Sequence, residues 1–497
     1  MVEKTKYIPT IGIECHVQLS TKTKLFSEVD NDARQKSPNS CVSPVDYGLP
    51  GMLPRLNKAA VRYAVRAGLA LNSKINLESR FDRKHYFYPD LPKGYQTTQL
   101  FYPIIGEGYV ELPSGGKVRI EHAHLEEDAG KLSHENGDSL VDLNRAGTPL
   151  VEIVSMPDIH SATEAREYTK ELWRLMTYAG VTFGDLYNGN MRFDVNISIA
   201  PEGSDKLGTR AEVKNLNSFR SVERAVEYEI KRQARLLDKG EAVVQETRGW
   251  SDATGETTSQ RSKEEAQDYR YMPEPDIPPI RLTEKDVVEQ KALMGIPLWI
   301  YRSFLRKFLS EDIVEVLLDY KNLTNALFQL NSYLCDAMNL TDEKPATNDQ
   351  RKVLSSKLKK IANLFSSVLL AEENSSLLND ELPTNEQLNT LVEMNEKDEL
   401  SSTGMKEVFI KFFDPEMHFK DTRTIAKELG VVQENDLGEL EKIVDAVLAK
   451  PETQKAQEDF KAGQEKVLGF LVGQVMKESR GKANPSAVQD ILRQKLQ

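Results

Sequence analysis

Two segments alternate apolar residues with acidic and basic ones, which is the pattern of a strand with one polar face. In "TIGIECHVQL" Glu14 and His16 fall on the side opposite the isoleucines, and in "MRFDVNISI" Arg192 and Asp194 fall opposite the apolar residues. Alternate side chains of a strand point to the same side of a sheet, so each pair lies side by side. Clustered carboxylates are typical ligands of a divalent cation, and a cation held in this way keeps positions open for water and phosphate oxygens.

Two further segments extend this polar face. "PLVEIV" sets Glu152 inside an apolar run, where a lone carboxylate is costly without a partner or an ion. "TRAEVKNLN" carries Glu212 and Lys214 at alternate positions. If these strands form one sheet, one face collects six polar residues: Glu14, His16, Glu152, Asp194, Glu212 and Lys214.

Two interpretations of this face remain open. An exposed sheet face stitched by weak cross-strand ion pairs has the same pattern. The excess of carboxylates near one histidine favours a divalent cation, with Mg²⁺ as the first choice because it prefers oxygen ligands. The histidine keeps Mn²⁺ open.

The segment "HAHLEEDAGK", residues 122–131, could contribute another carboxylate. With strand alternation Ala123, Leu125 and Glu127 point together, and we expect Glu127 on the polar face. His122 and His124 then lie opposite Glu127 and are predicted to be structural or surface groups. The following "GKLS" is not a phosphate-binding loop, because Leu125 stands where that motif has its first glycine.

The elements that position these residues can also be read from the sequence. A helix is predicted from the capping pair Ser161 and Glu164 to Gly180, a second over 221–238, and a third after Asn57. The proline-rich "YMPEPDIPPI", residues 271–280, excludes a helix and marks the end of the mixed first part. Beyond residue 300 the periodicity is helical.

Composition restricts the class of protein. With 497 residues, 39% hydrophobic and 29% charged, the chain is predicted to be soluble and globular, with about three domains. No run approaches the roughly 18 apolar residues of a membrane span, so no membrane association is expected. The net charge of -12 argues against nucleic-acid binding over the whole surface, but residues 450–497 carry nine Lys and Arg against six Asp and Glu.

The cysteines and one segment rich in basic and aromatic residues indicate which cofactors the chain could bind. Cys15, Cys41 and Cys335 are far apart and form no CxxC pair, so neither disulfides nor a zinc site is expected. "FDRKHYFYPDLPKGYQTTQ", residues 81–99, could offer its lysines and arginine to phosphates and its tyrosines to a nucleotide, or could be only an aromatic turn.

Ten segments, in order, resemble the B subunit family of the aspartyl/glutamyl-tRNA amidotransferases. They are "IGIECHVQLSTKTKLFS", "GLPGMLPRLN", "FDRKHYFYPDLPKGYQTTQ", "HLEEDAGK", "DLNRAGTPLVEIVS", "MRFDVNIS", "EVKNLNSFR", "QETRGW", "DYRYMPEPD" and "LVGQVMKESRGKANP". The resemblance implies an α+β fold with an N-terminal cradle domain built on a largely antiparallel or mixed sheet flanked by helices. An all-helical domain and a small helical, tRNA-binding tail follow. The implied boundaries are 1–292, 293–425 and 426–497.

The resemblance also implies an activity, that of a carbon–nitrogen ligase with glutamine as amido-nitrogen donor. ATP and Mg²⁺, or Mn²⁺, would serve to phosphorylate the side-chain carboxylate of misacylated Glu-tRNA(Gln) or Asp-tRNA(Asn). Ammonia channelled from a glutaminase A subunit would then form the amide, with a small C subunit completing a heterotrimer. The alternative is a non-catalytic tRNA-binding scaffold subunit. The expected location is the bacterial cytoplasm, with the mitochondrial matrix as the alternative, although no Arg-rich presequence precedes the first motif.

Site residues follow from the resemblance by matching motif. The implied metal ligands are Glu14, His16, Glu127, Glu152 and Asp194, followed by Glu126 and Asp128 as further candidates. The implied catalytic residues are Glu127, Glu14 and Lys84. The implied ATP contacts are Arg83, Lys84, Arg145, Arg192 and Lys214.

Overall fold

The chain folds into two compact units, Met1–Leu298 and Trp299–Gln497. The computed structural model describes residues 6–262, 268–341, 344–433, 437–479 and 483–496. The break lies close to the predicted end of the first domain at residue 292. The further division predicted at residues 425 and 426 stays a prediction.

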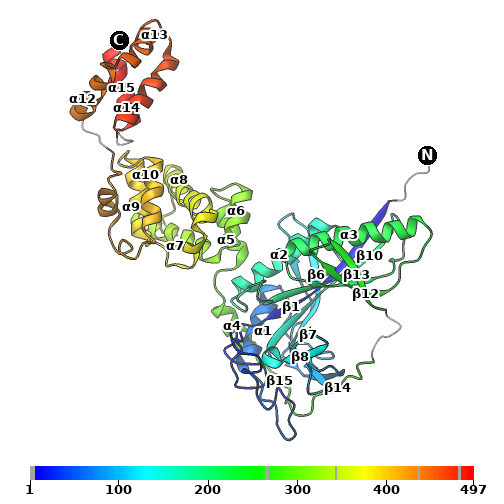
Figure 1. Cartoon of the computed structure of the whole chain (residues 1–497). Coiled ribbons are helices and arrows are strands. Elements are labelled where there is room, and N and C mark those ends of the chain that lie inside the picture. Colours follow the sequence, from blue (N-terminus) through cyan, green and yellow to red (C-terminus); the bar gives the residue numbers. More distant parts are fainter. Residues whose placement is uncertain (1–5, 263–267, 342–343, 434–436, 480–482, 497) are drawn as a thin grey trace. The chain divides into compact units, whose positions relative to one another are not determined.

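An eight-stranded mixed sheet forms the centre of the first unit (Figure 1). Its order is β13-β12-β11-β10-β1-β9-β6-β5, and every neighbouring pair is antiparallel except β11 and β12. This confirms the predicted fold class. The strands are β1 (Tyr7–Gln18), β5 (Gly108–Glu111), β6 (Lys117–Glu127), β9 (Pro149–Ser155), β10 (Met191–Pro201), β11 (Ala211–Leu216), β12 (Glu246–Ser251) and β13 (Glu256–Ser262).

Three helices supply the layer that covers the apolar face of the sheet: α1 (Lys58–Ala70), α2 (Ala162–Tyr178) and α3 (Phe219–Asp238). All three were predicted, and their caps explain where they begin. The Asn57 side chain accepts a hydrogen bond from the Ala59 amide, and the Ser161 hydroxyl accepts one from the Glu164 amide. Burial of each large apolar side chain between these layers contributes about 1.5–3 kcal/mol.

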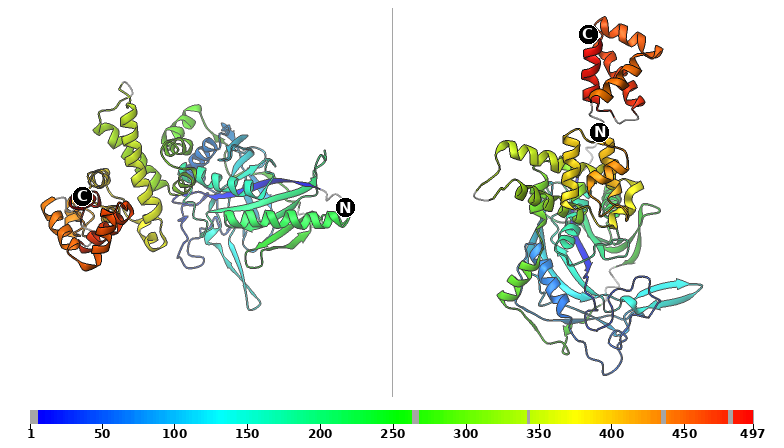
Figure 2. Two further views of the ribbon diagram at one scale, coloured as in Figure 1. Left: turned by 90° about the horizontal axis from the view of Figure 1, so that it is seen from above. Right: turned by 90° about the vertical axis from the view of Figure 1, so that its left-hand side faces the viewer.

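Smaller sheets add the segments that surround the polar face. They join β14 (Met272–Pro273), β3 (Asp82–His85) and β4 (Tyr95–Thr98), then β15 (Ile280–Arg281) and β2 (Glu78–Ser79). The proline-rich segment contains no helix, as predicted, and pairs with β3 through β14. A hairpin of β7 (Lys131–Glu135) and β8 (Asp138–Asp142) projects from the unit, in cyan in Figure 2. The last helix of this unit is α4 (Glu284–Leu293).

A buried network of charges joins α3 to the far edge of the sheet. The fully buried Glu229 carboxylate accepts hydrogen bonds from Arg232 at 2.9 Å and from the Thr257 hydroxyl at 2.6 Å. Arg248 of β12 approaches the same carboxylate at 3.2 Å. One acid therefore joins the helix to β12 and to the edge strand β13.

The second unit is helical in its described residues, as the periodicity predicted. Helices α12 (Leu437–Leu448), α14 (Leu468–Glu478) and α15 (Pro485–Leu496) enclose a cluster of buried residues that runs from Leu440 to Leu496. No described helix of the chain is long and apolar enough to span a membrane. The α-helices are α5 (Leu298–Leu305), α6 (Glu311–Leu317), α7 (Lys321–Ala337), α8 (Asn348–Leu364), α9 (Asn385–Glu396), α10 (Ser402–Lys411), α11 (Thr422–Glu428), α12 (Leu437–Leu448), α13 (Gln454–Lys461), α14 (Leu468–Glu478) and α15 (Pro485–Leu496).

Candidate functional site

A row of polar side chains crosses four adjacent strands on the face that the three helices leave uncovered. The sheet register pairs Arg192 of β10 with His16 of β1, His16 with Glu152 of β9, and Glu152 with His124 of β6. Glu126 stands two residues further along β6 on the same side as His124. The strand pairing therefore brings together residues that are more than a hundred positions apart in the sequence.

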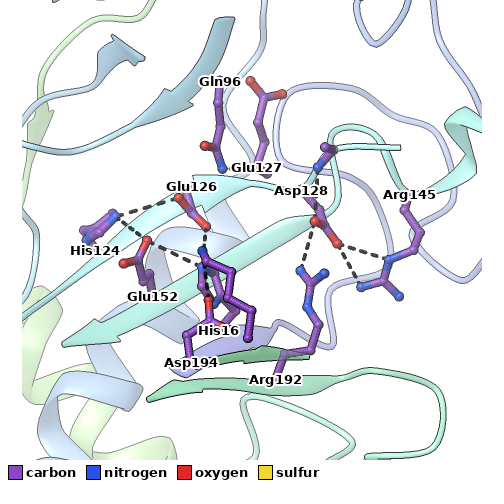
Figure 3. A network of polar contacts seen from close by, with 12 residues as sticks. His16, Gln96, His124, Glu126, Glu127, Asp128, Arg145, Glu152, Arg192 and Asp194 are labelled. Carbon is purple, nitrogen blue, oxygen red and sulfur yellow. Dashed lines mark hydrogen bonds and ion pairs between the residues drawn. The ribbon is translucent and has the colours of Figure 1, made fainter. Parts of the chain in front are cut away.

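The first of two ligand groups consists of His16, Glu126 and Glu152, whose nearest nitrogen and oxygen atoms lie within 4.8 Å of one another (Figure 3). His16 Nε2 lies 3.6 Å from a Glu126 oxygen and 3.7 Å from a Glu152 oxygen. Two carboxylates and one imidazole in this arrangement suit a divalent cation that keeps open positions for phosphate oxygens or water.

Cationic side chains surround this first group. Burial opposes the charge on His124, but Glu152 and Glu126 outweigh it and raise its pKa to about 10. Burial likewise lowers the pKa of Lys84 on β3, yet Glu126 and Glu152 turn the net shift upward. Although burial opposes ionisation, His124 and His16 hold the pKa of Glu152 well below its usual range. The Glu152 carboxylate is therefore ionised and ready to bind a cation at neutral pH.

The second group adjoins the first and consists of Glu14, Asp194 and Glu212, again within 4.8 Å of one another. Glu14 and Asp194 face each other across β1 and β10, and Glu212 comes from β11. Lys214 lies 3.0 Å from Glu212 and 3.4 Å from Asp194. Three carboxylates against one lysine leave a surplus of negative charge, which suits a second cation.

The surplus of negative charge affects the pKa of Glu14. Burial raises its pKa from the ordinary 4.5, and the neighbouring Glu152, Asp194 and Glu212 raise it further, while Lys214 opposes them. The folded state thus binds the Glu14 proton more tightly than the unfolded state does. Without a bound cation, stability falls as the pH rises from 4.5 through the raised pKa, and the penalty is complete above it.

We therefore expect Glu14→Gln to raise the melting temperature of the cation-free chain at pH 7, because the glutamine carries no charge to be penalised. The difference from wild type should shrink as the pH falls toward 4.5. Melting curves in EDTA across this pH range measure it, with the exposed Glu28→Gln as control. A lower melting temperature of Glu14→Gln at pH 7 would contradict this account of the second group.

Two arginines share one buried carboxylate beside the first group. Asp128 accepts hydrogen bonds from Arg145 at 2.8 Å and from Arg192 at 3.0 Å (Figure 3). Burial opposes ionisation of Asp128, but Arg192 and Arg145 hold its pKa below the usual range. Arg145 also lines a cavity of about 310 Å³ with Asn31, Lys131 and other residues. The paired guanidiniums are well suited to phosphate oxygens.

The predicted position of Glu127 on the polar face is wrong. Glu127 does point with Ala123 and Leu125, but these two residues are in the hydrophobic core, so their side of β6 faces away from the ligand groups. Glu127 lies outside both groups, where its carboxylate pairs with Lys93 and accepts the Thr97 amide at 2.9 Å.

Glu126 takes the position predicted for Glu127, and His124 joins it. The prediction that His124 is merely structural or at the surface missed its contacts with both carboxylates of the first group. One signal in the sequence could have found the two residues. Ala123 and Leu125 are the apolar residues of this segment, so His124 and Glu126 between them must occupy the polar face.

Arg83 is placed differently from the other predicted cations. Its guanidinium binds Glu274 at 2.8 Å and Asp276 at 2.9 Å, and it stacks over the Tyr95 ring. A guanidinium that already has two carboxylate partners does not fit the predicted contact with ATP phosphates. Lys84, Arg145, Arg192 and Lys214 all lie beside or within the two groups, which fits their predicted roles.

Comparison with known proteins identifies the family. Residues 9–288 match the GatB/GatE catalytic domain, and residues 350–496 match the GatB domain. The B subunit of the aspartyl/glutamyl-tRNA(Asn/Gln) amidotransferase of Persephonella marina is 44% identical over 499 residues, covering 99% of this chain and 100% of that protein. The B subunits of the same enzyme from Carboxydothermus hydrogenoformans and Thermotoga neapolitana are 42% and 41% identical, with 99% of both chains covered in each case. The resemblance in the sequence motifs is thereby confirmed, and the chain belongs to the B subunit family of the aspartyl/glutamyl-tRNA(Asn/Gln) amidotransferases.

Proposed function

We propose that this chain activates the side-chain carboxylate of a misacylated tRNA, Glu-tRNA(Gln) or Asp-tRNA(Asn), by phosphorylation with ATP. A carboxylate oxygen attacks the γ-phosphorus, the bond to the β,γ-bridging oxygen breaks, and ADP leaves. Ammonia from a partner glutaminase subunit then attacks the acyl carbon, and inorganic phosphate leaves as the amide forms. The names of the relatives, which are amidotransferase subunits acting on Asp- and Glu-tRNA, support the overall conversion.

The single observation that carries this proposal is the pair of adjoining ligand groups on one sheet face. Divalent cations, Mg²⁺ or Mn²⁺, bound there would neutralise charge on the transferred phosphoryl group. Phosphoryl transfer needs positioning and charge neutralisation more than a protein nucleophile.

The chain's own residues then hold the reactants. Arg145 and Arg192, held in place by Asp128, can bind phosphate oxygens beside the first group. Lys84 adds a positive charge on the side of Glu126 and Glu152. Binding through these groups would place ATP and the aminoacyl end of the tRNA over the same strands, with the charge of both reactants screened.

The alternative function is a scaffold that binds tRNA while the chemistry occurs elsewhere in the assembly. Replacing His16 by alanine in the complex with the partner subunits separates the two functions. If this chain is the kinase, ADP formation that depends on misacylated tRNA should fall about 100-fold, the effect of losing roughly 3 kcal/mol of transition-state stabilisation. Affinity for the tRNA should stay within about twofold of wild type.

The control is His134→Ala, the same replacement at an exposed position of β7 outside both ligand groups. Hydroxylamine added without glutamine provides a second readout, because it traps an activated carboxylate as a hydroxamate. Wild-type complex should yield the side-chain hydroxamate and His16→Ala should not. The α-hydroxamate that hydroxylamine forms by cleaving the ester to the tRNA appears with both proteins and is separated by chromatography. Undiminished ADP formation in His16→Ala would overturn the kinase assignment in favour of the scaffold.

A further inference from the structure

His124 lies beside the first ligand group and contacts both of its carboxylates. Its Nε2 lies 3.4 Å from one Glu152 oxygen and 3.9 Å from the Glu126 Oε2 atom. His16 faces the other Glu126 oxygen, Oε1, at 3.6 Å. Glu126 therefore presents one oxygen to each histidine, and His124 contacts both carboxylates of the group (Figure 3).

The ring of His124 is held firmly. It is only 7% exposed, and it stacks on the His122 ring with 5.4 Å between centroids and 20° between planes. Its Nδ1 atom is buried without a hydrogen-bond partner among the described residues. Nε2 is therefore the one ring nitrogen with polar partners there, and both of these are carboxylates.

The contacts of His124 bear on the repulsion between the Glu126 and Glu152 carboxylates. Two carboxylates that converge on one cation repel each other before the cation arrives, and the repulsion is strong where water is excluded. A ring nitrogen that lies against both carboxylates can hold them in place, and it leaves the other Glu126 oxygen, Oε1, facing His16. Residues that orient ligands in this way commonly change metal affinity by about 10–100-fold when they are replaced.

We propose that His124 is a positioning residue that aligns Glu126 and Glu152 for the divalent cation of the first group. The inference rests on the proposed function, which requires that cation. His124 itself need not touch the cation or the reactants. It acts through the two carboxylates, and the expected defect in its absence is weak cation binding rather than lost chemistry.

The test measures Mn²⁺ binding to the full chain by electron paramagnetic resonance. An Asp194→Asn background removes a ligand of the second group, so that the first group dominates the signal. In this background His124→Ala should weaken Mn²⁺ binding about 10–100-fold. His124→Gln should recover part of the loss, because its amide can replace Nε2 as a donor and the Nδ1 atom makes no bond to lose among the described residues. His134→Ala, on the exposed strand β7, is the matched control.

A second readout separates positioning from catalysis. In the otherwise wild-type complex, His124→Ala should need about 10–100-fold more Mg²⁺ for half-maximal ADP formation, and kcat should approach the wild-type value at saturating Mg²⁺. Structural damage alone would not be rescued by Mg²⁺. A kcat that stays low at saturating Mg²⁺ would overturn the positioning role.

The outcomes distinguish this inference from the proposed function. If the Asp194→Asn chain with His124 intact binds Mn²⁺ and His124→Ala binds it equally well, the positioning role is overturned and the cation site stands. If neither the Asp194→Asn chain nor the wild type binds Mn²⁺, the proposed cation site is contradicted. The positioning role of His124 is then contradicted as well. Weaker binding in His124→Ala, with recovery in His124→Gln, supports the proposal.

Discussion

Replacing Glu126 by glutamine should reduce ADP formation dependent on misacylated tRNA by about 100-fold or more in the assembled complex. Glu126 offers oxygens to both His16 and His124 and belongs to the first ligand group. The glutamine side chain has nearly the same shape but lacks the charge that a divalent cation requires. Mn²⁺ binding to the first group should weaken in parallel.

The neighbouring Glu127→Gln is the sharpest control, because it makes the same chemical change one residue along the chain. Glu127 pairs with Lys93, whose side chain is 11% exposed, on the opposite side of β6. Removal of its charge leaves a buried ammonium without its carboxylate, so the free energy of unfolding should fall by about 3 kcal/mol. Binding of Mn²⁺ should persist. A Glu127→Gln chain of normal stability that no longer binds Mn²⁺ would show that the assignment of the two glutamates is reversed.

The largest loss of stability is expected from Glu229→Ala. The substitution leaves Arg232 and Arg248 without the fully buried carboxylate they share, and it removes the acceptor of the Thr257 hydroxyl. Breaking a buried charge network by removing one member costs about 3–5 kcal/mol. Urea unfolding of the full chain, followed by hydrogen exchange of the β12 amides, measures the effect on this part of the molecule.

Glu227→Ala is the matched control, since Glu227 lies on the same helix but is exposed and pairs at the surface with Lys231. Its effect should stay within about 0.5 kcal/mol. The loss in Glu229→Ala should also reach the second ligand group, because Thr247 of β12 donates a hydrogen bond to Glu212 at 2.8 Å. An unchanged urea midpoint in Glu229→Ala would contradict the stabilising role of the network.

Much of the site could be predicted from local pattern. Strand alternation placed Glu14 and His16 on one face of β1, and the same rule placed Asp194, Glu152 and Lys214 on their strands. Alternation is a property of the extended backbone itself, so it does not depend on what surrounds the strand. The helices were predictable for a similar reason, because capping residues and apolar periodicity act within a few turns.

The sequence by itself therefore determined the family, the mixed fold and most members of the polar face. The tertiary structure alone decided that β9 lies between β1 and β6, which brings Glu126 of β6 to His16 of β1, since the order of strands depends on packing between segments far apart in the chain. It also decided that Arg83 is occupied by Glu274 and Asp276, and that Asp128 joins Arg145 to Arg192. These pairings join segments far apart in the chain, where no local rule acts, and only the folded backbone brings their charges within reach of one another.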